Sequence, residues 1–196
     1  MYEQEEPASK YAWIVYAIAT IMAGGLMGYA LASVRARPVA TLPVANVGGT
    51  APAPLIDEGQ LRAYREILAR DPGNVQAAVA AGNLLYDAHR YHEAIGFYQQ
   101  AFAGNPSDVN VSTDLGTAFW YAGRPDEALA QYEKSLALNA THAQTLFNMG
   151  IVRSDGKNDT AGAIEAWERL LAANPSYPDA PRVRSLIVDA RLKTQG

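Results

Sequence analysis

The sequence has 196 residues, and its 20 acidic side chains outnumber its 16 lysines and arginines, which gives a formal net charge of -4. This balance leaves no excess of basic side chains for a polyanion, so it argues against nucleic-acid binding. The chain contains no cysteine, which excludes disulfides, thiolate metal sites, covalently attached haem, a lipoprotein anchor and a thiol nucleophile. The length favours one modest domain with extensions, and we expect no cofactor and no metal.

The N-terminal region has the composition of a membrane anchor. Residues 1–10 form an acidic tail, and residues 11–34 are a run of 24 residues without a charge. As an α-helix this run would extend ~36 Å, which is enough to cross a bilayer. A cleaved signal peptide is the alternative, because Ala30-Leu31-Ala32 offers a cleavage site with small residues at both ends. The run is long for a signal peptide and its flank is acidic, so we predict an uncleaved transmembrane helix.

The flanking charges alone do not decide the orientation of this helix in the membrane. Lys10 stands on one side, with Arg35 and Arg37 on the other, a count that weakly favours a cytoplasmic C-terminal side. The usual arrangement of a short N-terminal tail inside and a large exported domain favours the opposite. We expect a single-pass protein of a bacterial inner membrane with a periplasmic C-terminal domain, and the cytoplasmic side stays open.

One face of the predicted transmembrane helix carries small side chains at intervals of four residues. Such a stripe allows a second helix to pack closely, although glycine is also common in membrane helices for other reasons. We predict helix packing at Thr20, Gly24, Gly28 and Ala32. The following residues, 35–56, are rich in Pro, Ala, Gly and Val and are expected to form a semi-extended linker.

The remainder of the chain repeats itself with a period of 34 residues, and the third repeat carries one extra residue, expected in a loop at about 154–161. Four series share this spacing: Tyr64, Tyr98, Tyr132 and Trp167; Pro72, Pro106 and Pro175, with Ala140 in the third place; Ala94, Ala128 and Ala163; and Gly82, Gly116 and Gly150.

This pattern resembles the tetratricopeptide repeat, in which each repeat is a pair of helices, A and B, over residues 57–178. The resemblance implies an all-α fold: a transmembrane helix, a linker, and an α-solenoid of about three helix pairs between flanking capping helices. We expect a half repeat at 58–72 that contains only helix B, full repeats at about 75–108, 109–142 and 143–177, and a C-terminal capping helix at 179–196. The half repeat either caps the stack or is completed by a helix from another molecule.

The repeated residues have packing roles in this resemblance and are therefore assigned to the core. The glycine of helix A allows helix B of the same repeat to approach closely, and the aromatic residue of helix B is expected to fill the space between adjacent repeats.

Members of this family bind polypeptides on the groove that the A helices line. Amide side chains can pair with a peptide backbone, and aromatic rings can pack against its side chains. The positions carried over from the family are Asn83, Tyr86, Asp87, Asn110, Thr113, Thr117, Trp120, Tyr121, Gln144, Phe147, Asn148 and Asp155. Packing against neighbouring helices is the alternative role for each of them.

Chaperone-binding members of the family use Lys and Arg in this groove to hold a C-terminal carboxylate. The matching positions here are Val79, Asn83, Asp114, Gln144 and Asn148. Only Asn83 agrees with the family pattern, so recognition of an acidic C-terminal tail is not expected. The groove is predicted to suit an extended polypeptide that is uncharged or mildly basic.

The sequence offers no basis for catalysis. His89 and His92 are three residues apart, but no third ligand stands at a familiar spacing. We find no phosphate-binding loop, nucleophile elbow or zinc-protease motif. The prediction is a protein that is not an enzyme and that has no small-molecule substrate.

Our leading hypothesis is a membrane-anchored scaffold that binds protein partners and supports the assembly or stability of a membrane-associated complex. One alternative is a chaperone-like factor in cytochrome c maturation or protein secretion, which the resemblance to anchored periplasmic members of the family implies. Another is a structural accessory subunit that is bound through its membrane helix.

Overall fold

The computed structural model describes residues 55–194. The predicted acidic tail, the predicted transmembrane helix with its stripe of Thr20, Gly24, Gly28 and Ala32, and almost all of the predicted linker lie outside the described residues. Within residues 55–194, no helix has both the length and the apolar character needed to span a bilayer.

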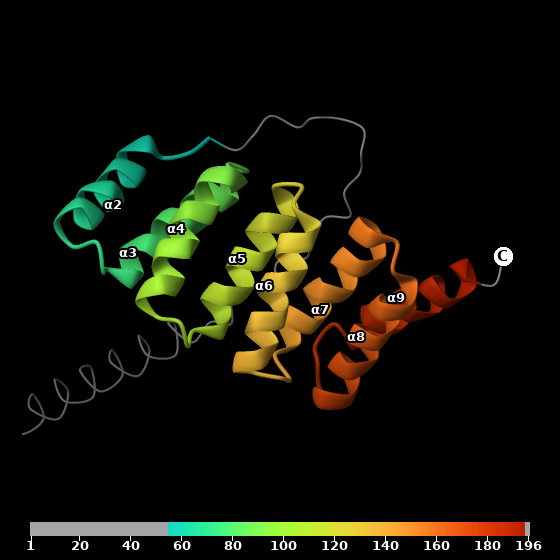
Figure 1. Cartoon of the computed structure of the whole chain (residues 1–196). Helices are drawn as coiled ribbons and strands as arrows, with labels where there is room; N and C mark the ends of the chain where they lie inside the picture. Colours follow the sequence, from blue (N-terminus) through green and yellow to red (C-terminus); the bar gives the residue numbers. More distant parts are fainter. Residues whose placement is uncertain (1–54, 195–196) are drawn as a thin grey trace, which may run out of the picture. The chain divides into compact units, whose positions relative to one another are not determined.

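Residues 55–194 form helices joined by short turns, and this part of the fold confirms the predicted all-α solenoid (Figure 1). One single helix comes first, three helix pairs follow, and one single helix comes last. In chain order these are α2 (Glu58–Arg70); α3 (Val75–Asp87) with α4 (Tyr91–Gly104); α5 (Val109–Tyr121) with α6 (Pro125–Leu138); α7 (Ala143–Ile151), continued by the π-helix η1 (Val152–Gly156), with α8 (Thr160–Ala173); and α9 (Ala180–Lys193).

Short polar side chains cap the starts of several helices. Asp57, Asn74, Asp108 and Asp159 each accept a hydrogen bond from a backbone N–H of the first turn that follows. These N–H groups have no partner inside the helix, so each cap contributes about 1 kcal/mol to the stability of its helix. Helix α6 begins instead at Pro125, whose fixed φ suits the first helical position.

The turn between the A and B helices requires one residue in the left-handed conformation. His89 has φ 59°, Gly123 has φ 76° and Asn158 has φ 52°, so these residues are spaced by 34 and then by 35. In the first turn the N–H of Arg90 donates to the carbonyl of Leu85 at 2.8 Å, as in a Schellman motif. The left-handed turn residues therefore recur with the same spacing as the repeated side chains of the sequence.

The extra residue of the third repeat is taken up by helix and not by a loop. Helix α7 passes directly into the π-helix Val152–Gly156, and the closing hydrogen bond runs from the Asp159 N–H to the Arg153 carbonyl at 2.8 Å. This bond spans one residue more than its counterpart from Arg90 to Leu85. A short π-helix commonly marks the insertion of one residue, because its wider turn accommodates the extra residue without breaking the helix.

A glycine on each A helix lies directly beneath an aromatic ring of the B helix in the same repeat. A Cβ atom on Gly82 would lie 2.8 Å from Tyr98 Cε1, and one on Gly116 would lie 2.5 Å from Tyr132 Cε1. Gly150 stands against the Trp167 ring in the same way. The predicted role of the glycines is confirmed. The rings, which we expected between adjacent repeats, lie at the crossing inside their own repeat.

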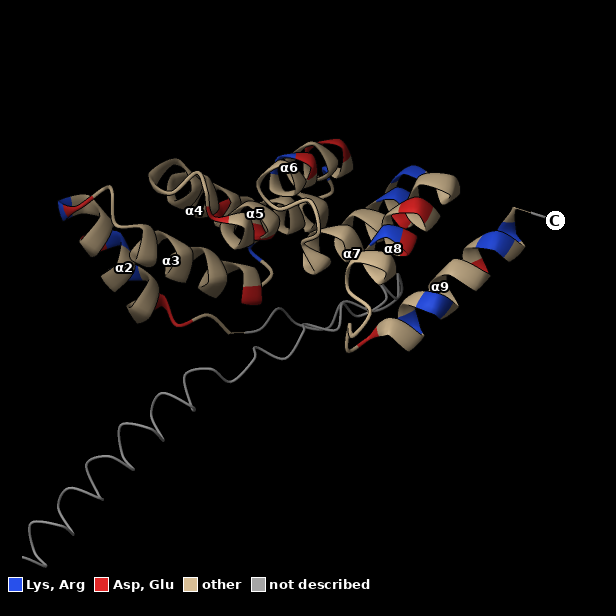
Figure 2. Ribbon diagram, turned by 90° about the horizontal axis from the view of Figure 1, so that it is seen from below, with Lys and Arg blue, Asp and Glu red and all other residues tan. Residues whose placement is uncertain are grey.

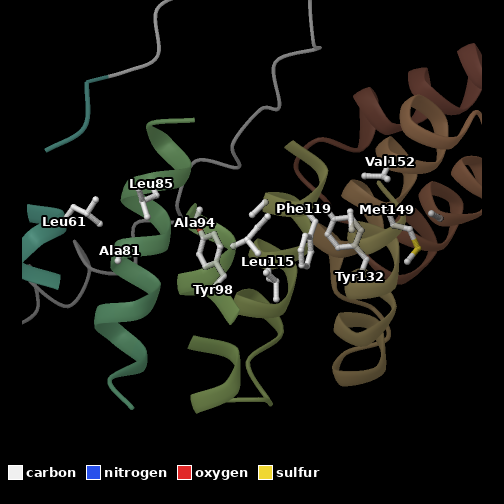
Figure 3. Packing of buried hydrophobic residues seen from close by; sticks show 14 residues of the cluster. Leu61, Ala81, Leu85, Ala94, Tyr98, Leu115, Phe119, Tyr132, Met149 and Val152 are labelled. Carbon is white, nitrogen blue, oxygen red and sulfur yellow. The ribbon is translucent and has the colours of Figure 1, made fainter. Parts of the chain in front are cut away.

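Buried apolar side chains continue from each repeat to the next in one large cluster (Figure 3), and a separate smaller cluster contains Leu68 of α2, Ala101 of α4 and Val111 of α5. Leu61 of α2 is fully buried against the first pair, and Tyr132 of α6 is fully buried at the centre of the row. Val152 of η1, also fully buried, extends the core into the third repeat. The stack is therefore held together by side chains that come from every pair.

The glycine contact generates a stability prediction with a matched control. Gly116→Ala should lower the stability of the protein by about 1–3 kcal/mol, because the added methyl group enters the Tyr132 ring. Gly96→Ala on α4 should raise it by roughly 0.5–1 kcal/mol, since a Cβ there meets no atom within 4 Å and alanine favours helix. Urea unfolding of both full-length variants, followed by circular dichroism, measures the difference. Equal midpoints would contradict the proposed contact.

Candidate polypeptide-binding surface

The A helices α3, α5 and α7 are the elements that should present a binding surface. In Figure 2, α4 and α6 lie on one side of the row and α3 and α7 on the other. Helices α3, α5 and α7 contain no lysine or arginine, and their charged side chains are Asp87 and Asp114. The A-helix surface is therefore electrostatically suited to a neutral or basic polypeptide and not to an acidic one.

Two hydroxyl side chains and a histidine join α5 to α7. Thr113 Oγ1 lies 2.7 Å from Thr145 Oγ1, and His142 Nδ1 lies 2.8 Å from the same Thr145 oxygen. Thr113 and Thr145 are 1% and 0% exposed, so neither is accessible to a ligand. Burial lowers the pKa of His142 below its ordinary value, because removal from water disfavours the imidazolium.

A second group of hydrogen bonds joins the same two helices one turn further on. Thr117 Oγ1 donates to the Thr113 carbonyl at 2.9 Å and accepts from Asn148 Nδ2 at 3.0 Å. It also lies 3.1 Å from the Tyr132 hydroxyl, which must be the donor because the Thr117 proton is already used. A hydroxyl has one proton and two lone pairs, so the capacity of Thr117 is fully used inside the stack.

The burial of these side chains corrects part of the predicted groove. The polar residues Thr113, Thr117 and Asn148 connect neighbouring A helices, and the Phe147 carbonyl accepts a hydrogen bond from Trp167 Nε1 at 3.2 Å. Gln144 is partly buried and donates to Asn148 at 3.0 Å, while Asn83 accepts from the Tyr98 hydroxyl at 2.8 Å. The side chains placed inside the stack and not on a free face are Thr113 (1% exposed), Thr117 (8%), Phe147 (3%) and Asn148 (3%).

Trp120 contacts the π-helix of the next repeat. A Cβ on Gly156 would lie 2.6 Å from Trp120 Cζ3 and 3.1 Å from Pro125 Cβ. The indole ring therefore lies against the backbone of Gly156, and a larger residue there would displace it. This contact joins the second and third repeats, so Trp120 has a packing role in the described structure.

Three tyrosines meet where α3 and α5 end and α4 begins, and we call them the tyrosine cluster: Tyr86, Tyr91 and Tyr121. Tyr86 makes edge contacts with Tyr91 at 5.3 Å and with Tyr121 at 5.7 Å, and Tyr91 stacks on Tyr121 at 5.1 Å between ring centroids. All three side chains are partly exposed. Burial raises the pKa of each phenol above its ordinary value, so each keeps its proton at neutral pH. The Tyr86 hydroxyl donates to Tyr121, which leaves the Tyr91 and Tyr121 phenols as donors.

The sequence identified two members of the tyrosine cluster and missed the third. Tyr91 lies at the first position of a B helix, outside the A-helix positions carried over from the family. Its proximity to Tyr86, five residues away across a tight turn, was the available indication. Of the other predicted site residues, Asp87, Asn110 and Asp155 are exposed. Asp87 follows Tyr86 directly, whereas Asn110 lies at the opposite end of the A helices, in the first turn of α5.

A pocket of about 330 Å³ opens on the other side of the row, between α4 and α6. Its floor is the buried Leu115 and Phe119 of α5, and Arg124 lies over the Phe119 ring at 4.7 Å from the centroid. None of its lining residues was predicted from the sequence, because the space exists only where two B helices diverge over an A helix. The lining residues are Gln99, Phe102, Ala103, Leu115, Phe119, Glu127, Ala130, Gln131 and Lys134.

Comparison with known proteins finds a repeat family that matches part of the chain. A family model described as tetratricopeptide repeat matches residues 61–109 and 113–152. A crystal structure of MamA protein has a TM-score of 0.57 at 22% identity, covering 69% of this chain and 77% of that chain. A crystal structure of the Yersinia enterocolitica type III secretion translocator chaperone SycD, in an alternative dimer, has a TM-score of 0.58 at 17% identity. The match covers 62% of this chain and 95% of that chain.

SycD in complex with a peptide of the translocator YopD is similar at a TM-score of 0.57 and 17% identity, covering 61% of this chain and 93% of that chain. At these identities the likeness shows a shared fold. No curated protein sequence matches the chain.

The buried environment of His142 gives a prediction about pH. Because the pKa of His142 is lowered in the folded protein, the unfolded chain binds a proton more readily, and stability should fall as pH drops below about 6.5. His142→Asn should reduce this loss between pH 7 and pH 5.5. The measurement is the urea midpoint at each pH, with His92→Asn on the exposed surface of α4 as the matched control. If the urea midpoint of His142→Asn falls with pH as steeply as that of the wild-type protein, His142 is not the source of the loss of stability.

Proposed function

Because its helix pairs resemble tetratricopeptide repeats, we propose that this protein is a non-enzymatic scaffold that holds an extended, neutral or basic polypeptide on its A-helix surface. The tyrosine cluster is the observation that carries the proposal. Its three rings are already packed against one another, so little side-chain freedom is lost when a partner binds them. Each ring offers an apolar face, and the phenols of Tyr91 and Tyr121 can donate to a peptide carbonyl, since the Tyr86 hydroxyl already donates to Tyr121.

Charge near the tyrosine cluster supports the same class of partner. Asp87 is exposed directly beside Tyr86, and the A helices α3, α5 and α7 contribute no cation. An acidic peptide would meet repulsion from Asp87, and Arg90, which adjoins Tyr91 in the sequence, already pairs with Glu58 and Glu93. A lysine or arginine side chain of a partner can approach Asp87. The binding surface that we propose consists of the tyrosine cluster, Asp87 and Asn110.

The setting of this scaffold rests on the sequence. We propose that residues 11–34 anchor the chain in a bacterial inner membrane, with the repeats on the periplasmic side, and that the bound polypeptide is a subunit of a membrane-associated complex. The apolar run of 24 residues without a charge supports the anchor. The stripe of Thr20, Gly24, Gly28 and Ala32 is the proposed contact with a second membrane helix.

A chaperone-like role in secretion is the second candidate. SycD, a secretion chaperone of the same fold, has been crystallised with a peptide of the translocator YopD. A chaperone of this kind would hold its client before assembly and then release it, whereas a scaffold stays bound in the finished complex. Co-purification of the full-length protein from mild detergent distinguishes the two, because only a scaffold should be recovered in constant proportion with the assembled complex.

Peptide binding tests the proposed surface directly. Three synthetic peptides of equal length and matched apolar content, one acidic, one neutral and one basic, are titrated against the full-length protein and followed by fluorescence anisotropy. We expect the neutral and basic peptides to bind and the acidic one not to bind. Tyr121→Ala should weaken binding about tenfold or more, equivalent to about 1.4 kcal/mol, because it removes a ring from the cluster.

Two further variants complete the binding experiment. Asp87→Asn should reduce the preference for the basic over the neutral peptide without abolishing binding. Phe102→Ala, in the pocket between α4 and α6, is the matched aromatic control and should leave affinity unchanged. If Phe102→Ala weakens binding and Tyr121→Ala does not, the peptide sits on the opposite side of the row and the proposed surface is wrong.

A further inference from the structure

The described part of the chain begins and ends with half of a helix pair. Helix α2 precedes the first A helix and occupies the place of a B helix, since Tyr64 stands 34 residues before Tyr98. Helix α9 packs on α8 as the A helix of a fourth repeat, and no B helix follows it among residues 55–194. The two ends therefore lack opposite halves of the same unit.

Within residues 55–194, no helix covers the face of α2 that an A helix would occupy. Ile67 is 41% exposed, whereas the residues at the same position in the other B helices, Ala101, Ser135 and Leu170, are all 0% exposed. Gln60 is exposed in the same way, although its equivalents Ala94, Ala128 and Ala163 are fully buried.

The face of α9 that a B helix would cover is open as well. Val188 is 53% exposed, and its equivalents Leu85 and Phe119 are 0% and 7% exposed. Ser185 stands 35 residues after Gly150, at the position where the aromatic ring of helix B meets helix A, and it too is exposed. Leu192, one turn beyond Val188, is 62% exposed. A helix that only capped the stack would be expected to present a polar outer face here.

We propose that α9 of one molecule pairs with α2 of a second molecule and that the two helices together complete a tetratricopeptide-type helix pair. In this pairing Tyr64 faces Ser185, at the position where Tyr132 faces Gly116. Because serine carries a Cβ atom, α9 and α2 lie further apart than the two helices of a pair within the chain. Ile67 meets Pro181, as Ser135 meets Ser112 with 2.8 Å between their hydroxyl oxygens. The interface continues a packing that the chain already uses inside each of its three pairs.

Charge at the ends of the two helices agrees with an antiparallel pairing. The acidic Asp57 and Glu58 stand at the start of α2, and the basic Arg191 and Lys193 stand at the end of α9 (Figure 2). In the pairs within the chain, the start of helix B lies at the end of helix A. Within one molecule Glu58 pairs with the partly buried Arg90, and the exposed Arg191 pairs with the exposed Glu168, so the additional attraction is modest.

The open faces also contain one charged position. Arg184 occupies the place of Ala81, Leu115 and Met149, which are all buried. Its long aliphatic stem can pack in the contact while the guanidinium reaches the rim. A contact between two different faces is heterologous, so it produces closed rings or open chains of molecules and not a symmetric pair.

Disulfide trapping tests this pairing cleanly because the chain contains no cysteine. Full-length Ile67→Cys and Pro181→Cys proteins are mixed in mild detergent under mild oxidation. We expect a disulfide-linked heterodimer in the mixture, because the equivalent Ser112 and Ser135 side chains are in contact. Leu138→Cys, which replaces an exposed leucine on α6 (43% exposed), is the matched control and should cross-link to Pro181→Cys at least tenfold less.

Sedimentation velocity gives an independent measurement. The wild-type protein should associate as its concentration increases. We expect association to be at least tenfold weaker in Ile67→Glu and in Val188→Glu. The control variant Leu138→Glu should associate as the wild-type protein does. A mixture of Ile67→Glu and Val188→Glu should form a discrete dimer, since each retains one intact face. A monomeric wild-type protein, cross-linking no greater than the control, or efficient cross-linking of Ile67→Cys with itself would each overturn the proposal.

Discussion

Each helix pair is held at a separation that only glycine allows, because the ring of the B helix occupies the place where a Cβ atom of the A helix would stand. Gly116 and Tyr132 show the contact at the centre of the stack. The buried ring can then reach across helix A with its polar atom, and the Tyr132 hydroxyl meets Thr117. Thr117 also accepts from Asn148 of α7, so this approach places the Tyr132 hydroxyl beside the hydrogen bonds that join α5 to α7.

The helix pairs could be predicted from the sequence because their determinants recur at a fixed spacing. The glycines, the aromatic residues and the left-handed turn positions His89, Gly123 and Asn158 all follow one period. Local chemistry also marks several helix starts, as the capping by Asp108 illustrates. These features are set within one repeat, so they can be recognised in a single sequence.

The functional surface was harder to predict because it depends on contacts between repeats. Thr113 and Thr145 are 32 residues apart, and Asn148 and Thr117 are 31 apart. A threonine or asparagine on helix A looks the same in the sequence whether it faces a ligand or the next A helix. Tyr91 was missed for the converse reason, since it joins Tyr86 and Tyr121 from a B helix.

The contact of Trp120 with Gly156 has a consequence for how the stack comes apart. Solenoids often open one repeat at a time, because each repeat contacts only its neighbours. Here the indole ring and the hydrogen bonds between α5 and α7 bind the second and third repeats to each other at both ends of their A helices. These two repeats are expected to exchange their amide hydrogens as a single cooperative unit. Pulling on the C-terminal end would then detach α9 first and afterwards release two repeats in one step.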